Sequence, residues 1–497
     1  MPRYGMLLDT KTCIGCLACT VACKVAHNNP PGVWMAPVIS EEIGSYPEVH
    51  RVHLPLMCMQ CEDAPCARAC PTGAIKRRAD GIVAIDSDVC CGSGACVVAC
   101  PHGALQLPRT RAYYYGQPTP FERAKGDYFP AGTAQKCDLC VDRVDRGLVP
   151  ACVEACPTES RIFGDLEDPE SHLSVRLRLE ETDVLQTGAF THPTVRYTTD
   201  GLRDAGVDAG HLRLPYRVQE AWDSYHAGEF TLLGAGGGLA VAHLLLGAAN
   251  ALSTILVGIS ILLVALGGLV LIYDLGRPLR FLCALQNQRR SWISRGALGD
   301  FVFLLVALAL VMGIGSPGNA VLSLLLAFIA LLVVTYPALA MASLRAVPAW
   351  GGVLVPLAFL VDGLSLGAGL ALVTLLGARG RGPGGAAAYL TWALVAGALL
   401  RGAWLHLYRT RLARSPNGRA TAQSSTRASW RVGMVVGVLA AAPFALLVLT
   451  LAGGSAVAAA ALATAATFAG SFAGKLYVLR TGAKPTPVDP EVEARAV

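Results

Sequence analysis

The chain has 497 residues, of which 53% are hydrophobic and only 15% charged, and its formal net charge is +6. This length allows two or three domains, but the composition is uneven: sixteen of the seventeen cysteines lie between Cys13 and Cys156, whereas residues 230–478 are mostly Ala, Leu, Val and Gly. The net charge comes from arginines between apolar segments, which indicates contact with lipid head groups and no nucleic-acid partner.

Four cysteine motifs follow one another in the first third of the chain. They are Cys13, Cys16, Cys19 and Cys23; Cys58, Cys61, Cys66 and Cys70; Cys90, Cys91, Cys96 and Cys100; and Cys137, Cys140, Cys152 and Cys156. In ferredoxin-type motifs, three closely spaced thiolates bind one cluster, and a cysteine before proline binds the other cluster of a pair. Motifs two, three and four end in Cys-Pro, and the first residues contain no apolar export signal. We therefore expect iron–sulfur clusters rather than disulfides or structural zinc.

These repeats predict an α+β ferredoxin-like domain over residues 1–170, built from two modules that each hold a pair of clusters. Because the last cysteine of one motif serves the other cluster of its pair, motif one is expected to pair with motif four, and motif two with motif three. The predicted groups are Cys13, Cys16, Cys19 and Cys156; Cys137, Cys140, Cys152 and Cys23; Cys58, Cys61, Cys66 and Cys100; and Cys70 with Cys90, Cys91 and Cys96 of motif three. We expect three of these four clusters to be 4Fe-4S.

Motif three departs from the spacing of the other motifs. Ser93 stands where a cysteine is expected, and Cys91 is an additional cysteine beside Cys90. Cys91 could complete a 4Fe-4S cluster after a shift of the loop, Ser93 could ligate iron, or one iron could be lost to leave a 3Fe-4S cluster; Cys91 could also be a free thiol. Gly92 and Gly94 make the intervening backbone adaptable, which favours Cys91 as a ligand.

Three stretches of this region carry a family resemblance over about residues 4–170. They are Cys61-Glu62-Asp63-Ala64-Pro65-Cys66, Cys70-Pro71-Thr72-Gly73-Ala74, and Pro150-Ala151-Cys152-Val153-Glu154-Ala155-Cys156-Pro157 with Ile162-Phe163-Gly164-Asp165. They resemble the four-cluster electron-transfer subunits of the DMSO reductase and polysulfide reductase families. The resemblance implies a wire of clusters that docks a separate molybdopterin-type catalytic subunit, with molybdenum or tungsten.

Residues 171–229 are polar and contain no cysteine, so we expect a tether there. An all-α membrane domain is predicted over residues 230–480, followed by a polar tail over residues 481–497. The apolar runs are about 20 residues each, which is enough to cross about 30 Å of hydrocarbon. Eight such helices are expected, near residues 230–252, 253–275, 298–315, 320–342, 351–377, 386–408, 432–452 and 455–478.

The membrane region carries a second resemblance. Its stretches are Asp274-Leu275-Gly276-Arg277-Pro278-Leu279-Arg280-Phe281, Arg290-Ser291-Trp292-Ile293-Ser294-Arg295-Gly296, and Val347-Pro348-Ala349-Trp350 with Pro356-Leu357-Ala358-Phe359-Leu360. They are similar to polysulfide-reductase-type (NrfD-like) quinone-reactive membrane subunits, which implies a membrane anchor that passes electrons between the clusters and quinone. Two alternatives are an ion-translocating redox module, and a passive cluster-bearing anchor for a hydrogenase-like partner.

Ionisable side chains inside membrane helices are costly and are therefore candidate functional residues. The candidates for a quinone site are Asp274, Arg277, Asp300, Tyr336 and His243; a structural ion pair is the alternative for the carboxylates. Asp362 is expected to pair with Arg401 or to relay protons. The histidines of the predicted helices, His243 and His406, lie at unmatched depths, so we expect no haem.

Basic residues predict the orientation of the membrane domain. If the cluster domain lies on one side, the loops 276–297, 343–350 and 409–431 and the C-terminal tail share that side and carry fifteen Arg and Lys residues, whereas the opposite side carries Arg379 and Arg381. Positive charge marks cytoplasmic loops. We therefore expect a multi-pass protein of the cytoplasmic membrane whose iron–sulfur domain faces the cytoplasm.

Overall fold

The computed structural model describes residues 1–185, 190–199, 216–246, 251–313, 320–379, 385–414 and 456–485. The chain forms two compact units. The cysteine-rich unit comprises Met1–Arg217, Leu275–Gln286 and Lys484–Val497, and the helical unit comprises Val218–Asp274 and Asn287–Ala483. The chain therefore leaves the cysteine-rich unit, returns to it between two long helices, and ends in it.

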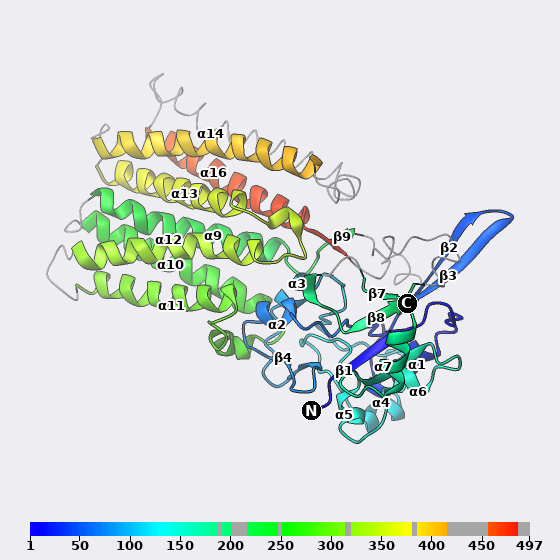
Figure 1. The fold of residues 1–497 in the computed structure, drawn as a ribbon. Helices are drawn as coiled ribbons and strands as arrows, with labels where there is room; N and C mark the ends of the chain where they lie inside the picture. Colours follow the sequence, from blue (N-terminus) through cyan, green and yellow to red (C-terminus); the bar gives the residue numbers. More distant parts are fainter. Residues whose placement is uncertain are drawn as a thin grey trace. The chain divides into compact units, whose positions relative to one another are not determined.

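A four-stranded sheet with the order β6-β1-β8-β7 supports the cysteine-rich unit. Strand β1 (Tyr4–Leu8) pairs antiparallel with β6 (Arg161–Asp165) and parallel with β8 (Val195–Thr198), and β8 pairs with β7 (Thr182–Asp183). The apolar side chains of Met6, Leu7 and Leu8 are fully buried. This sheet joins the beginning of the cysteine-rich region to its end, which brings motifs one and four together (Figure 1).

Short helices begin within or beside the cysteine motifs. They are α1 (Ala18–His27), α2 (Pro65–Ala69), α3 (Ala95–Ala99), α5 (Val141–Val144) and α6 (Ala151–Glu154). Helix α1 contacts α6, and α2 contacts α3, so motif one packs with motif four, and motif two with motif three, as predicted. The remaining elements are the hairpins β2 (Val38–Ser45) with β3 (Glu48–Pro55) and β4 (Ile75–Arg77) with β5 (Val83–Ile85), and helix α4 (Pro120–Lys125).

The expected tether over residues 171–229 is partly wrong. Helix α7 (His172–Leu179) and strands β7 and β8 belong to the cysteine-rich unit. Strand β8 is an inner strand of the sheet, where Val195 and Tyr197 are fully buried while Arg196 between them is exposed. This alternation is typical of a strand with one buried face, but four residues are too few to stand out in a polar segment.

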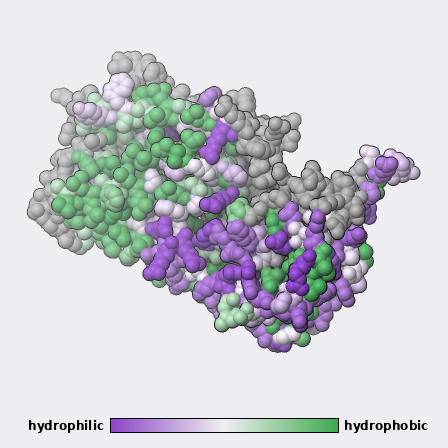
Figure 2. All heavy atoms as spheres, in the orientation of Figure 1, coloured by the Kyte–Doolittle hydropathy of each residue, from purple (hydrophilic) through white to green (hydrophobic). Residues whose placement is uncertain are grey.

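The helical unit contains seven long helices in its described part, together with short 3-10 turns. They are α9 (Ser224–Ala242), α10 (Ala251–Asp274), α11 (Trp292–Val311), α12 (Ala320–Ala342), α13 (Leu354–Arg379), α14 (Gly385–Arg414) and α16 (Ala456–Arg480), with turns η3 (His243–Leu246) and η5 (Pro348–Trp350). Six of them, α10 to α14 and α16, are long and apolar enough to cross a membrane. Their hydrophobic surface is visible in Figure 2.

Helix α9 packs against four of the other long helices, α10, α12, α13 and α16. A Cβ atom on Gly238 would overlap the carbonyl oxygen of Gly363, so glycine allows α9 and α13 to approach closely. The first predicted helix, residues 230–252, is thus displaced: α9 begins at Ser224, ends at Ala242, and is not among the six apolar helices. The predicted helix at 432–452 lies outside the described residues.

The segment between α10 and α11 belongs to the cysteine-rich unit and contains the turn η4 (Pro278–Leu285). Its Gly276 N–H donates to the Gly92 carbonyl oxygen at 3.1 Å, and the Arg277 N–H donates to the Cys91 carbonyl oxygen at 3.0 Å. Gly92, Gly132 and Gly276 meet backbone to backbone, and a Cβ atom on any of them would overlap another. A second connection between distant parts of the chain is the two-stranded ribbon of β9 (Tyr216–Val218) and β10 (Ala483–Pro485).

Candidate cluster ligands and membrane carboxylates

Cysteines of each predicted group interact with one another in the structure, although Cys96, Cys137 and Cys152 also interact with cysteines of a neighbouring group. Thirteen of these sixteen are buried, and only Cys13, Cys16 and Cys156 are more open. Cys13, Cys16, Cys19 and Cys156 line one small cavity. In the other groups the thiols interact electrostatically: Cys23 and Cys137 with Cys140 and Cys152; Cys66 with Cys58, Cys61 and Cys100; and Cys70 with Cys90, Cys91 and Cys96.

The residue before the second cysteine position has a left-handed backbone in every motif. These residues are Gly15 (φ 66°), Gln60 (φ 47°), Gly92 (φ 73°) and Leu139 (φ 59°). Gln60 and Leu139 have side chains, which cost free energy in this conformation, whereas glycine adopts it freely. The recurrence of the conformation in all four motifs indicates that the loops are shaped for a common ligand. The repeated geometry fits a cluster, in which N–H groups of such loops can bond sulfide.

Motif three has left-handed residues at the same two positions as motif one, despite its different sequence. Gly92 and Gly94 are left-handed (φ 73° and 69°), as are Gly15 and Leu17 (φ 66° and 63°). Counting from the first cysteine of each motif, Ser93 therefore occupies the place of Cys16, and Cys91 occupies the place of Ile14. Ile14 is exposed, whereas Cys91 is buried and its carbonyl accepts the Arg277 hydrogen bond.

The surroundings of the thiols suit a metal cluster. Burial raises the pKa of the Cys66, Cys96 and Cys137 thiols well above its usual value, so their thiolates need a cationic partner such as iron. In the part of the chain that the structure describes, no three His, Cys, Asp or Glu side chains close around a single metal ion.

Some cysteines also receive hydrogen bonds. The Thr191 hydroxyl donates to Cys61 Sγ at 3.0 Å, and its oxygen lies 3.4 Å from Nε2 of the buried His102. Burial lowers the pKa of His102 to about 4, so this imidazole is neutral at physiological pH. Thr191 lies in the segment first expected to be a tether, which is why the sequence did not indicate it.

Two cations are buried among the cysteine groups. Lys136 is fully buried, and its Nζ donates to the carbonyl oxygens of Val83 and Cys137, the latter at 2.9 Å. Arg161 is 2% exposed, and its Nη1 lies 3.8 Å from Met57 Sδ. Neither side chain forms a salt bridge with a carboxylate in the described ranges; Lys136 interacts electrostatically with Asp138 and with three cysteines, and Arg161 with Cys152 and Cys19.

In the helical unit, carboxylates from three helices converge. The Tyr336 hydroxyl donates to Asp300 Oδ2 at 3.0 Å, and His226 Nδ1 lies 3.6 Å from Asp274 Oδ2. Glu229 is only 2% exposed and interacts electrostatically with both Asp300 and Asp274. Within the described residues, Glu229 Oε2 and Asp300 Oδ1 are buried without a hydrogen-bond partner. Such a cluster can hold and exchange protons beside a polar ligand.

Within the helical unit, the structure places Asp274, Asp300 and Tyr336, three of the five residues predicted for the quinone site, around Glu229. Arg277 belongs to the cysteine-rich unit, where its Nη1 donates to the Ser87 carbonyl oxygen at 2.9 Å. His243 lies seventeen residues beyond His226, which is about 25 Å along the helix. The sequence missed His226 and Glu229 because the first helix was expected to begin at residue 230; their spacing of three, on one helix face, is the signal that was available.

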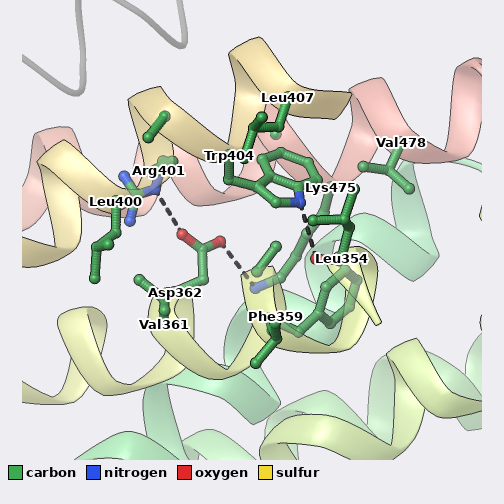
Figure 3. A pocket seen from close by; sticks show the side chains of 14 residues that line it. Leu354, Phe359, Val361, Asp362, Leu400, Arg401, Trp404, Leu407, Lys475 and Val478 are labelled. Atoms are coloured by element: carbon green, nitrogen blue, oxygen red, sulfur yellow. Dashed lines mark hydrogen bonds and ion pairs between the residues drawn. The ribbon is translucent and has the colours of Figure 1, made fainter. Parts of the chain in front are cut away.

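Asp362 forms a second buried network, drawn in Figure 3. Its carboxylate accepts from Arg401 Nε at 2.6 Å and from Ser471 Oγ at 2.7 Å, and Lys475 Nζ lies 3.7 Å away. The predicted pair of Asp362 and Arg401 is therefore confirmed, and Lys475 is an addition. These charges line an apolar pocket between α13, α14 and α16, whose walls include Phe359 and Trp404.

Replacing Asp362 by asparagine is expected to destabilise the helical unit by about 3–5 kcal/mol, because it leaves Arg401 and Lys475 buried without their counter-charge. Unfolding in mixed detergent micelles measures this free energy. Ser471→Ala is the matched control, since it removes the two hydrogen bonds of the Ser471 hydroxyl, to Asp362 and from Lys475, but no charge, and should cost about 2 kcal/mol. Equal losses in the two variants would contradict the assigned role of the carboxylate.

Both parts of the chain match known families. Residues 49–113 and 118–166 match the 4Fe-4S dicluster domain, and residues 214–488 match the polysulfide reductase family. Among similar proteins, the arsenate respiratory reductase iron-sulfur subunit ArrB of Shewanella sp. (strain ANA-3) is 33% identical over 237 residues, which is 42% of this chain and 100% of ArrB.

Two further relatives cover a similar share of the chain. A tetrathionate reductase subunit of Salmonella typhimurium is 38% identical over 210 residues, 41% of this chain and 75% of that relative. Protein NrfC of Escherichia coli is 39% identical over 195 residues, 38% of this chain and 78% of NrfC. The chain thus belongs to the polysulfide reductase family through its membrane part and to the iron–sulfur subunits of reductase complexes through its N-terminal part: it is an electron-transfer protein with its own membrane anchor.

Proposed function

We propose that this protein passes electrons between a molybdopterin-type catalytic subunit and the quinone pool of the membrane. The names of its relatives as subunits of arsenate and tetrathionate reductases support the catalytic partner. The observation that carries the membrane half of the proposal is the segment after α10, whose Gly276 and Arg277 N–H groups bond the backbone of motif three. This segment continues directly from Asp274, a member of the carboxylate cluster.

The four cysteine groups are proposed to hold four iron–sulfur clusters, three of them 4Fe-4S. The ligands of the three 4Fe-4S clusters are the twelve cysteines of the groups that do not contain Cys91; the group of Cys70, Cys90, Cys91 and Cys96, in which motif three departs from the common spacing, is a separate case. Bound clusters would transfer single electrons. Because the two modules pack together, electrons could pass from one cluster to the next along the domain. The buried thiols and the repeated left-handed loops support this assignment.

The carboxylate cluster is proposed to hold the quinone head. Tyr336 and His226 offer hydrogen-bond donors, while Glu229, Asp274 and Asp300 exchange the two protons that accompany quinone reduction. Only Leu275 separates Asp274 from Gly276, so the covalent chain keeps their Cα atoms within about 7 Å. The covalent chain therefore links Asp274 of the carboxylate cluster directly to Gly276 and Arg277, whose N–H groups bond motif three.

The test of this function compares two ways of reducing the purified complex. Asp274→Asn should slow reduction of the clusters by a quinol analogue while leaving their reduction by a soluble donor unchanged. Visible and EPR spectra follow both reactions. Unchanged quinol kinetics in a correctly inserted Asp274→Asn protein would remove the direct role of this carboxylate, and failure of the soluble donor would indicate damaged clusters instead.

The motif-three cluster is proposed to have lost one iron. Ser93, not Cys91, stands at the backbone position where motif one has a ligand, and the hydrogen bond from Arg277 holds the Cys91 backbone in place. An oxidised 3Fe-4S cluster is paramagnetic, whereas an oxidised low-potential 4Fe-4S cluster is not. EPR of anaerobically purified, oxidised protein should therefore show one stoichiometric signal, which Ser93→Cys should remove. A silent oxidised wild type would instead support a 4Fe-4S cluster completed by Cys91.

The clusters and the catalytic partner are proposed to face the cytoplasm, on the basis of the arginine-rich loops. A single cysteine introduced at Gly384, in the loop with few basic residues, should react with a membrane-impermeant maleimide added to intact cells. A cysteine introduced at Ser424, in the basic loop, should react only after the cells are opened. The reverse labelling pattern would place the iron–sulfur domain on the outer side.

A further inference from the structure

Lys136 and Arg161 each lie between two cysteine groups. Lys136 interacts electrostatically with Cys58 and Cys66 of one group and with Cys137 of the next. Arg161 interacts with Cys152 of the same group as Cys137, and with Cys19 of the group beyond it. Lys136 thus lies between the group of Cys58 and the group of Cys137. Arg161 lies between the group of Cys137 and the group of Cys19.

Neither cation is explained by ordinary packing. A buried charge costs several kilocalories per mole unless a partner compensates it, and most of the partners here are cysteines. Lys136 donates to two carbonyl oxygens and interacts with Asp138 and three cysteines, and Arg161, whose Nη2 has no hydrogen-bond partner among the residues described, interacts with Cys152 and Cys19. Arg161 cannot lose its proton. A methionine or leucine would fill either position without this cost.

We propose that Lys136 and Arg161 are potential-setting residues, fixed cations that raise the reduction potentials of the clusters on either side of them. The proposal rests on the cluster ligation proposed above. An added electron makes a cluster more negative, and a nearby cation stabilises that state more strongly in a poorly screened interior than in water. Cluster charge and surroundings are the established determinants of such potentials. Two successive cations would keep three clusters close enough in potential for reversible electron flow.

The geometry predicts a pattern that a general change in stability would not produce. The group of Cys23, Cys137, Cys140 and Cys152 interacts electrostatically with both Lys136 and Arg161. Its cluster should respond to the loss of either one. The cluster of Cys58, Cys61, Cys66 and Cys100 should respond only to Lys136, and the cluster of Cys13, Cys16, Cys19 and Cys156 should respond mainly to Arg161.

The experiment is an EPR-monitored redox titration of the full-length protein with Lys136→Gln and Arg161→Gln, which remove the charge but keep hydrogen-bond donors. At a fixed potential, each variant should raise the oxidised-to-reduced ratio of its two neighbouring clusters at least tenfold, equivalent to about 59 mV for one electron. Lys136→Arg should restore the wild-type ratio. Lys125→Gln is the matched control, because it removes one charge from an exposed position and should shift none.

Unchanged potentials in variants with full iron content would overturn the proposal, as would equal shifts of all four clusters. If Lys136→Gln fails to assemble clusters, the Arg161→Gln titration decides the question alone. Iron content and reduction by a soluble donor are measured in the same samples. If the wild-type protein itself lacks the expected iron, the proposal that the cysteines bind four clusters is wrong. That result would not test the effect of the two cations.

Discussion

Replacing Gly276 by alanine should lower quinone-linked turnover at least tenfold while leaving the iron content of the protein unchanged. A Cβ atom at this position would overlap the carbonyl group of Gly132, whose backbone cannot move aside easily because Gly92 packs against it too. The segment after α10 would have to lift away, and the hydrogen bonds to Gly92 and Cys91 would be lost. Steady-state turnover with a quinol analogue, together with iron analysis, measures both quantities.

Gly268→Ala is the matched control for this experiment. Gly268 lies in the neighbouring helix α10, and a Cβ atom there would have open space around it. The control should therefore keep wild-type turnover, and alanine should even favour the helix slightly. Equal turnover of the Gly276 and Gly268 variants would mean that electron transfer to quinone does not depend on the contact between this segment and motif three.

Replacing Glu229 by glutamine should lower turnover with quinone about 100-fold, the usual size of a lost proton-transfer group. The glutamine has nearly the same shape but cannot release a proton, and the change leaves Asp274 and Asp300 in place. Reduction of the clusters by a soluble donor should continue at the wild-type rate, because Glu229 lies in the helical unit. Stopped-flow spectroscopy separates the two reactions.

Glu220→Gln makes the same chemical change at an exposed position a few residues earlier in the chain. It should leave quinone turnover at the wild-type level. If Glu229→Gln also kept full turnover in a folded, membrane-inserted protein, proton exchange would have to be assigned to Asp274 and Asp300 without Glu229. A loss of both quinone and soluble-donor activity would point to a folding defect.

Cysteine spacing predicted the grouping of the ligands because it is a local property: a few residues between thiols leave little freedom, and the Cys-Pro signature marks the ligand that crosses to the partner cluster. The order of the motifs then required motif four to fold back on motif one, as β1 and β6 do by pairing. Six of the predicted membrane helices were equally visible, because long apolar runs need no tertiary information.

Features that depend on contacts between distant segments were harder to predict. Helix α9 is less apolar than a typical membrane span because it contains His226 and Glu229, and its burial by α10, α12, α13 and α16 is a tertiary property. Arg277 was placed with Asp274 because they are three residues apart in the sequence. The structure assigns them to different units, since Gly276 and Arg277 use their backbone to bond motif three.

The return of the chain to the cysteine-rich unit after α10 also constrains how the protein is made. During translation, all four cysteine motifs leave the ribosome before residues 275–286, which complete the surroundings of motif three, have been synthesised. Helices α9 and α10 must be made, and handed to the insertion machinery, before Gly276 can reach Gly92. The maturing protein must therefore protect an unfinished motif three while its first membrane helices are inserted, and a fragment ending before α9 would keep that edge permanently open.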